Sequence, residues 1–202
     1  MIFEAADKMK NFEAGIFNIL DDKRKELESQ GRKIYNFSVG TPDFEPEEHI
    51  MKAVSEACLH PENYRYALSD RDELLEAVIR RYKHRYHTDI AKNEIMSVYG
   101  SQEGMTHIFL PLINPGDVVL LPNPGYPIFN TGAFVAQASQ WLYPLTEEND
   151  YLPDLAAIPE DVRRAAKVMV VSYPANPICK TAPDSFYEEL ITFARENEIL
   201  II

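Results

Sequence analysis

The chain has 202 residues, of which 46% are hydrophobic and 26% charged, an ordinary globular composition that suffices for one sizeable domain with its own core. The net charge is -12, and no cluster of Lys and Arg stands clear of acidic neighbours, which argues against a nucleic-acid partner. Two distant cysteines, Cys58 and Cys179, argue against a disulfide framework or a zinc site and favour a reducing, cytoplasmic location, and neither a secretory signal nor a membrane-spanning run is visible.

The first third of the chain is predicted to be mostly helical. Apolar residues recur there with a helical period, and Gly31 is a plausible stop for the first helix. Pro46 suits the first turn of the second helix, because its ring fixes the φ angle that a helix start needs. The predicted elements are, in chain order, a helix over residues 13–30, an extended piece over 34–39, a turn at 40–43, a helix over 46–60 and a helix over 72–86.

From residue 94 the pattern changes to short apolar strands that alternate with helices. The predicted elements are a strand over 95–99, a helix over 102–112, a strand over 118–121, a helix over 128–136, an extended piece over 141–145, a strand over 168–171, a helix over 183–197 and a strand over 199–202. Wholly apolar strands alternating with helices are typical of a parallel sheet covered on both faces. The predicted fold class is therefore α/β, and such sheets bind ligands beyond the carboxyl ends of their strands.

The loop Gly100-Ser101-Gln102-Glu103-Gly104 lies between a predicted strand and a predicted helix. Free N–H groups and the dipole at a helix start favour an anion there, and Gly100 allows the backbone to approach closely. Ser101 and Gln102 add side-chain donors. The alternative is a simple strand-to-helix turn in which Ser101 caps the helix.

The loop Pro122-Asn123-Pro124-Gly125-Tyr126-Pro127 follows the next strand. Its prolines and glycine favour a rigid turn that presents Tyr126 at a defined angle. A tyrosine held in this way can stack on a flat heteroaromatic ring. The alternative is that Tyr126 packs inward as part of the core.

The loop Ser172-Tyr173-Pro174-Ala175-Asn176-Pro177 follows a buried strand. Asn176 precedes a proline, which favours an extended backbone, and its amide can donate to a phenolic or alkoxide oxygen. An ordinary Asn-Pro turn is the alternative. Taken together, the three loops supply an anion cradle, a stacking ring and an oxygen donor, and pyridoxal 5'-phosphate (PLP) is a flat ring that carries a phosphate and a hydroxyl.

These motifs resemble the class I/II aminotransferases, PLP enzymes of fold type I, from about residue 13 to residue 202. The loops Gly-Ser-Gln-Glu-Gly and Asn-Pro-Gly-Tyr-Pro are most similar to the diaminopimelate aminotransferase-like branch. The resemblance implies a mostly parallel large domain with helices on both faces, incomplete here over residues 46–202. Residues 1–45 would form a helical and extended segment of the small domain and the dimer arm.

The resemblance also implies roles for individual residues. The cofactor-binding residues would be Gly100, Ser101, Gln102, Tyr126, Asn176 and Tyr66. Among them, Tyr66 would reach across a dimer to the partner's phosphate. Gly40 lies in the segment Ser38-Val39-Gly40-Thr41-Pro42-Asp43-Phe44, similar to the family's G-x-P-D-F element, and its backbone would face the α-carboxylate of the substrate.

Some positions depart from the family pattern. After Tyr66 the chain has Arg71 and Leu75-Glu76 instead of glycine and Leu-Arg, and after Asn176-Pro177 it has Ile178-Cys179 instead of Thr-Gly. We expect the chain to be truncated inside its last apolar strand, with a natural edge strand as the alternative. The family's aspartate, second tyrosine, Schiff-base lysine and carboxylate-binding arginine would then lie downstream. The chain itself supplies no catalytic residue, since Lys167 and Lys180 are explained as ordinary solvated lysines.

The predicted function is a PLP-dependent aminotransferase that moves an amino group between an amino acid and a 2-oxo acid, both small molecules. We expect a homodimer when complete, without nucleic-acid or membrane partners, and an inactive chain when these 202 residues stand alone. Two alternatives stay open. One is a carbon–sulfur lyase of the same fold, and the other is a non-catalytic binding or dimerisation remnant.

Overall fold

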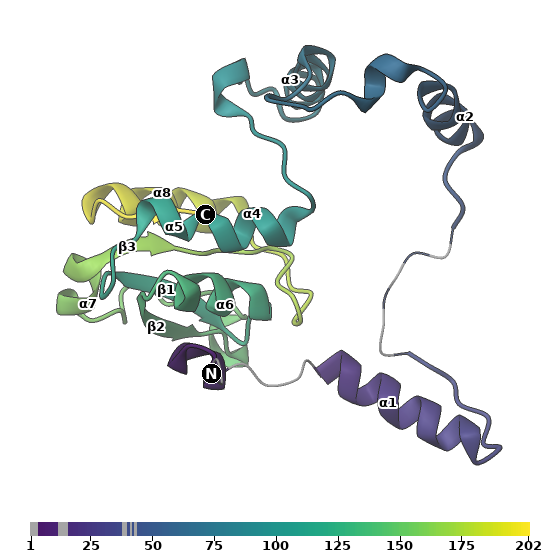
Figure 1. Cartoon of the computed structure of the whole chain (residues 1–202). Coiled ribbons are helices and arrows are strands. Elements are labelled where there is room, and N and C mark those ends of the chain that lie inside the picture. The colour runs from purple at the N-terminus through teal and green to yellow at the C-terminus, as the bar shows by residue number, and fades with distance from the viewer. Residues whose placement is uncertain (1–3, 12–15, 38–39, 41, 43) are drawn as a thin grey trace. The chain divides into compact units, whose positions relative to one another are not determined.

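The computed structural model describes residues 4–11, 16–37, 40, 42 and 44–202. The contacts within the chain divide it into two units, residues 1–68 and residues 69–202, and Figure 1 labels their main elements. The predicted turn at residues 40–43 and the extended piece at 34–39 fall partly outside the described residues, and residues 34–37 carry no regular secondary structure. No described helix is long and apolar enough to cross a bilayer.

The first unit is built from short helices. Its elements are η1 (Asp7–Asn11), α1 (Ile16–Ser29), α2 (Glu48–Ala57) and η2 (Pro61–Tyr64). Gly31 ends α1 as predicted, because its φ of 78° lets its N–H reach the carbonyl of Glu28 at 2.9 Å while the next N–H reaches Leu27. The prediction for Pro46 was wrong: Glu47 is the N-cap, with an extended ψ of 140°, so the proline precedes the helix instead of lying in its first turn.

In the second unit, α3 (Asp72–Tyr86) has the predicted bounds, but the predicted strand over residues 95–99 is absent. Its backbone is extended at Ile95, with φ −124° and ψ 136°. The N–H of Ser97 donates to the carboxylate of Asp70 at 2.9 Å rather than to a neighbouring strand. The strand prediction was therefore wrong, because strand pairing depends on a partner that the pattern of apolar residues does not specify.

The predicted helix over 102–112 is divided into α4 (Ser101–His107) and α5 (Phe109–Leu112). Pro111 accounts for the interruption, since it has no N–H to offer the carbonyl of His107 and its ring crowds that carbonyl. The next helix, α6 (Pro127–Val135), packs against this pair through Gly132. A Cβ at Gly132 would lie 2.8 Å from the carbonyl oxygen of Met105 and 2.8 Å from the ring of Phe109, so the contact requires glycine.

Of the remaining elements, all but η3, which contacts α3, belong to a parallel sheet and its connecting helices, as predicted. The remaining elements are η3 (Lys92–Glu94), β1 (Val118–Asn123), β2 (Ser139–Pro144), η4 (Glu147–Asn149), α7 (Glu160–Ala165), β3 (Ala166–Met169), α8 (Asp184–Glu196) and β4 (Leu200–Ile201). All four strands are parallel, in the order β2-β1-β3-β4. The short helix α7 was not predicted, because its six residues, four of them charged, carry no apolar period.

The core consists of two hydrophobic layers, one on each face of the sheet. Successive residues of β1 point to opposite faces, so that Val119 and Leu121 join Phe109 of α5 and Phe129 of α6, whereas Leu120 joins the opposite layer. That opposite layer is completed by Phe186, Leu190 and Phe193 of α8. Burial on both faces explains why Val119, Leu120 and Leu121 of β1 form an unbroken apolar run.

The order of the strands creates a crevice between β1 and β3. The chain leaves β1 through α6 toward β2, and it leaves β3 through α8 toward β4. These two helices pack on opposite faces of the sheet. The loops that follow two adjacent strands therefore diverge, which is the position where open parallel sheets bind ligands.

Candidate functional site

A narrow pocket, too tight to admit a water molecule, lies in this crevice at the carboxyl ends of β1 and β3. It is lined by Pro122, Pro124, Gly125, Phe129, Tyr143, Leu145, Ser172, Tyr173, Ala175 and Asn176. Two of the three loops singled out in the sequence therefore meet here. Gly125 is needed for the tight packing of its loop, because a Cβ would lie 2.6 Å from the carbonyl oxygen of Pro122.

Tyr126 joins the crevice to the first loop. It is the N-cap of α6 and is half-buried, and its ring meets that of Phe129 edge to face, with centroids 6.0 Å apart. The side-chain amide of Gln102 donates a hydrogen bond to the hydroxyl of Tyr126. The ring is thus anchored to the core along one edge and tied to the start of α4 through its hydroxyl. Stacking of Tyr126 on a flat heteroaromatic ring stays a prediction.

The start of α4 is formed by Gly100, with a φ of 95° that other residues rarely adopt. Gly100, and not Ser101, is the N-cap, so the interpretation of Ser101 as a cap was wrong. Ser101 and Gln102 are exposed and lie in the first turn, where backbone N–H groups have no acceptor within the helix. This arrangement suits an anion.

Glu103 is a site residue that the sequence prediction overlooked. Its carboxylate accepts a hydrogen bond from the N–H of Tyr99 at 2.6 Å and so closes the turn around Gly100. The negative charge of Glu103 therefore lies beside the backbone N–H of Tyr99. A glutamate three residues after a helix N-cap is a known signature of this kind of turn, and this signal was available in the sequence.

Asn176 lies in the loop after β3, and its side chain is exposed at the pocket. The preceding residue, Ala175, is buried, and its N–H donates to the carbonyl of Lys180 at 2.9 Å. Tyr173 donates from its hydroxyl to the carbonyl of Tyr151 at 2.9 Å. The loop is therefore held on both sides of Asn176, which leaves the asparagine amide presented at the crevice.

Tyr66 and Gly40 belong to the other compact unit, residues 1–68. The side chain of Tyr66 is 90% exposed, and Gly40 is also exposed. Both lie on surface segments of that unit. The neighbouring positions Ser38, Val39, Thr41 and Asp43 of the glycine-containing element lie outside the described residues.

The two lysines near the last loop, Lys167 within β3 and Lys180 after the loop, are engaged in ion pairs. Lys167 lies 2.6 Å from the carboxylate of Asp117, and Lys180 lies 2.6 Å from that of Asp150. The hydrogen bond from Lys167, together with that from the backbone of Asn114, lowers the pKa of Asp117 below its usual value. These contacts give both lysines a structural explanation.

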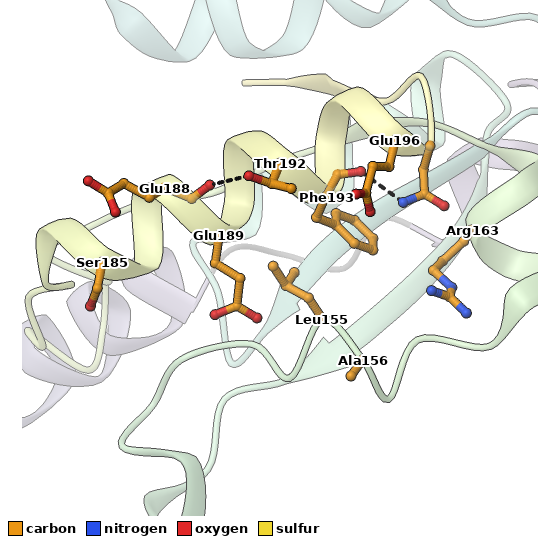
Figure 2. Close-up of a pocket in the computed structure, with 10 residues that line it drawn as sticks. Leu155, Ala156, Arg163, Ser185, Glu188, Glu189, Thr192, Phe193 and Glu196 are labelled. Carbon is orange, nitrogen blue, oxygen red and sulfur yellow. Dashed lines mark hydrogen bonds between the residues drawn. The ribbon is translucent and has the colours of Figure 1, made fainter.

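A second cavity, of about 440 Å³, lies along α8 and contains none of the predicted site residues (Figure 2). Its wall on the helix includes Glu188, Glu189 and Glu196, and Arg163 lies at one end. Three glutamates outnumber the one arginine, and the resulting negative charge disfavours a phosphorylated ligand. The described residues contain no group of three or more metal-ligating side chains.

Comparisons with known proteins show which family the chain resembles. The chain is 38% identical to the LL-diaminopimelate aminotransferase of Aquifex aeolicus over 99% of its own length and 52% of that protein. It is 37% identical to the enzyme of the same name from Halothermothrix orenii, over 98% of its own length and 51% of that protein. The chain thus spans about half the length of the curated relatives it matches.

Solved structures show the same correspondence. The substrate-bound BacF structure from Bacillus subtilis superposes on the whole chain with a TM-score of 0.91 and 35% identity, and the chain covers 51% of it. The probable N-succinyldiaminopimelate aminotransferase from Thermus thermophilus gives a TM-score of 0.84 at 34% identity, over 93% of this chain and 51% of that one. The parallel sheet is therefore part of a large domain of PLP fold type I.

The family model described as aminotransferase class I and II matches residues 32–202. This span includes the three loops that contain Gly100, Tyr126 and Asn176. It also includes Gly40 and Tyr66 of the first unit. The chain belongs to the class I and II aminotransferases, a family of PLP-dependent enzymes.

Proposed function

We propose that this protein is a PLP-dependent aminotransferase that moves an amino group between an amino acid and a 2-oxo acid. The observation that carries the proposal is the crevice between β1 and β3, where the loop of Tyr126 meets that of Asn176 and is tied to the start of α4 by the Gln102–Tyr126 hydrogen bond. The names of the relatives support it and make diaminopimelate the first amino acid to assay.

The residues present fit the cofactor by the chemistry of their donors. The first turn of α4, at Gly100, Ser101 and Gln102, would hold the phosphate, because its N–H groups and the Ser101 hydroxyl are donors beside a glycine that needs no side-chain space. Tyr126 would support the ring, and the amide of Asn176 would donate to its phenolic oxygen. When bound, PLP supplies an aromatic ring that withdraws electrons from the substrate.

Residues of the first unit complete the proposal. The backbone of Gly40 would bind the α-carboxylate of the substrate, and Tyr66, which is 90% exposed, would reach the phosphate of a partner subunit. The complete enzyme would then be a two-fold dimer with shared sites, which sedimentation analysis can test against an active monomer. A cytoplasmic location belongs to the same proposal, because Cys58 and Cys179 are both free and exposed, a state that a reducing compartment maintains.

The phosphate assignment predicts that Ser101→Asp weakens PLP binding by at least about fivefold, since two like unit charges about 4 Å apart repel by about 1 kcal/mol even in water. The aspartate is compatible with the first turn of a helix, so the fold should persist. Titration of PLP by its absorbance measures the effect. The neutral variant Ser101→Asn is the matched control and should bind at nearly the affinity of the unmodified chain. Equal affinity of the aspartate variant would show that the phosphate binds elsewhere.

A further inference from the structure

The hydrogen-bond ladder between β1 and β3 ends at a proline. Leu120 pairs with Met169, and the N–H of Val170 donates to the carbonyl of Leu120 at 3.0 Å. In a regular parallel ladder the next bond would run from the N–H of residue 122 to the carbonyl of Val170. Residue 122 is Pro122, which has no N–H. The ladder therefore lacks a donor at the point where the crevice begins.

Tyr143 supplies a donor at this position. It lies on β2 as the register partner of Pro122, and its hydroxyl donates to the carbonyl of Val170 at 2.5 Å. The side chain of Tyr143 is 2% exposed and Val170 is 1% exposed, so water has little access to this bond. A buried carbonyl without a donor is costly, and the phenol hydroxyl takes the place of the N–H that proline lacks.

This bond fixes the last point before the chain leaves the sheet for the loop of Asn176. On the other side, the N–H of Val171 donates to the carbonyl of Ile202 at 2.8 Å. Pro122, Tyr143 and Asn176 line the same pocket. Beyond Leu120 the β1–β3 ladder has no donor at Pro122, and the Tyr143 hydroxyl supplies the hydrogen bond to the carbonyl of Val170.

Burial, with a smaller contribution from Tyr173, raises the pKa of Tyr143. The hydroxyl consequently stays protonated and remains a donor throughout the physiological range. Tyr173 and Leu145 face the same pocket, and Phe186 and Leu190 belong to the same hydrophobic layer, so the surroundings of the phenol are largely apolar.

We propose that Tyr143 is a positioning residue for the cofactor crevice: its hydroxyl replaces the ladder donor that Pro122 lacks and so sets the position of the segment from Val170 to Asn176. The part that concerns the cofactor rests on the proposed function, because Asn176 is the residue through which a displaced loop would weaken PLP binding. Tyr143 itself need not contact the ligand.

The decisive experiment is a double-mutant cycle that restores the missing donor from the other strand. Tyr143→Phe removes the hydroxyl, Pro122→Ala restores a backbone N–H at residue 122, and the double variant combines the two. Tyr64→Phe is the matched control, because Tyr64 also donates to a backbone carbonyl, that of Cys58 at 2.7 Å, but in the other compact unit. Amide hydrogen exchange over residues 170–178 is measured without ligand, and PLP affinity is measured by titration.

Tyr143→Phe is expected to accelerate exchange over residues 170–178 by about tenfold, the effect of leaving one buried carbonyl unsatisfied, and to weaken PLP binding severalfold. Pro122→Ala in the same chain should restore both quantities to near the starting values, which a general loss of packing would not do. If Tyr143→Phe alone does not fold, recovery of folding in the double variant supports the proposal in the same way.

Two results would overturn the proposal: exchange over residues 170–178 that changes no more than in the Tyr64→Phe control, or simple additivity of the Tyr143→Phe and Pro122→Ala effects. Failure of the proposed function gives a different result. In that case the unmodified chain would not bind PLP, whereas the exchange of this segment would still follow the cycle and support the structural role of Tyr143.

Discussion

Phe109→Ala is expected to lower the free energy of unfolding by about 3–5 kcal/mol, because the ring is fully buried and its loss leaves a cavity. Phe109 packs between the sheet and α6, with Gly132 directly above its ring. Since α4 and α6 carry Gln102 and Tyr126, the substitution should also loosen the hydrogen bond between them. Urea unfolding followed by circular dichroism measures the main effect.

The neighbouring residue provides the control. Leu110 is 52% exposed. Apart from the difference in helix propensity between leucine and alanine, Leu110→Ala should change the free energy of unfolding by no more than about 0.5 kcal/mol. Equal losses in the two variants would contradict the assignment of Phe109 to the core between α5, α6 and β1.

A polypeptide of residues 1–202 is expected to show no transamination above the background of free PLP. The reaction needs a positioned group that moves the proton from Cα of the amino acid, and such acid–base catalysis contributes roughly 10²–10⁴-fold. Lys167 and Lys180 are occupied by Asp117 and Asp150, and neither lines the crevice. Formation of the 2-oxo acid from diaminopimelate, with 2-oxoglutarate as acceptor, measures turnover.

A chimera provides the positive arm of this experiment. The chain is fused to the half of the Aquifex aeolicus relative that it does not cover, and circular dichroism and sedimentation first establish that the fusion folds. We expect transamination by the chimera and its loss on Ser101→Asp. Turnover by residues 1–202 alone would contradict the prediction, and a folded, PLP-binding chimera without transamination would contradict the proposed function.

Local patterns predicted the regular elements well. The period of α3 gave its bounds, and the apolar run at residues 118–121 indicated a strand covered on both faces, because both signals are properties of consecutive residues. The prediction of a strand over residues 95–99 was wrong because strand pairing depends on residues that are distant in the sequence. The N–H of Ser97 is bound by Asp70, which lies 27 residues earlier, and no local pattern specifies such a partner.

In the candidate site, too, local features could be predicted from the sequence and contacts between distant residues could not. The loops of Gly100, Tyr126 and Asn176 were visible in the sequence because each follows an apolar segment and contains residues that favour turns. The bond between Gln102 and Tyr126 spans 24 residues and depends on how α4 packs against α6, so the sequence could not predict it. The hydrogen bond from Tyr143 to Val170 could not be predicted either, because it depends on the register of the strands. Only that register shows that Pro122 lies where a ladder N–H is missing.

The central claim is that the first turn of α4 binds the phosphate of PLP beside the β1–β3 crevice. The most direct measurement is an NMR titration of the backbone amides with PLP and, in parallel, with pyridoxal, which has the same ring without the phosphate. We predict that PLP shifts the amide resonances of Gly100, Ser101 and Gln102, together with those of Tyr126 and Asn176, and that pyridoxal leaves the first three unchanged. Equal shifts with both compounds, or shifts confined to residues outside these loops, would contradict the claim.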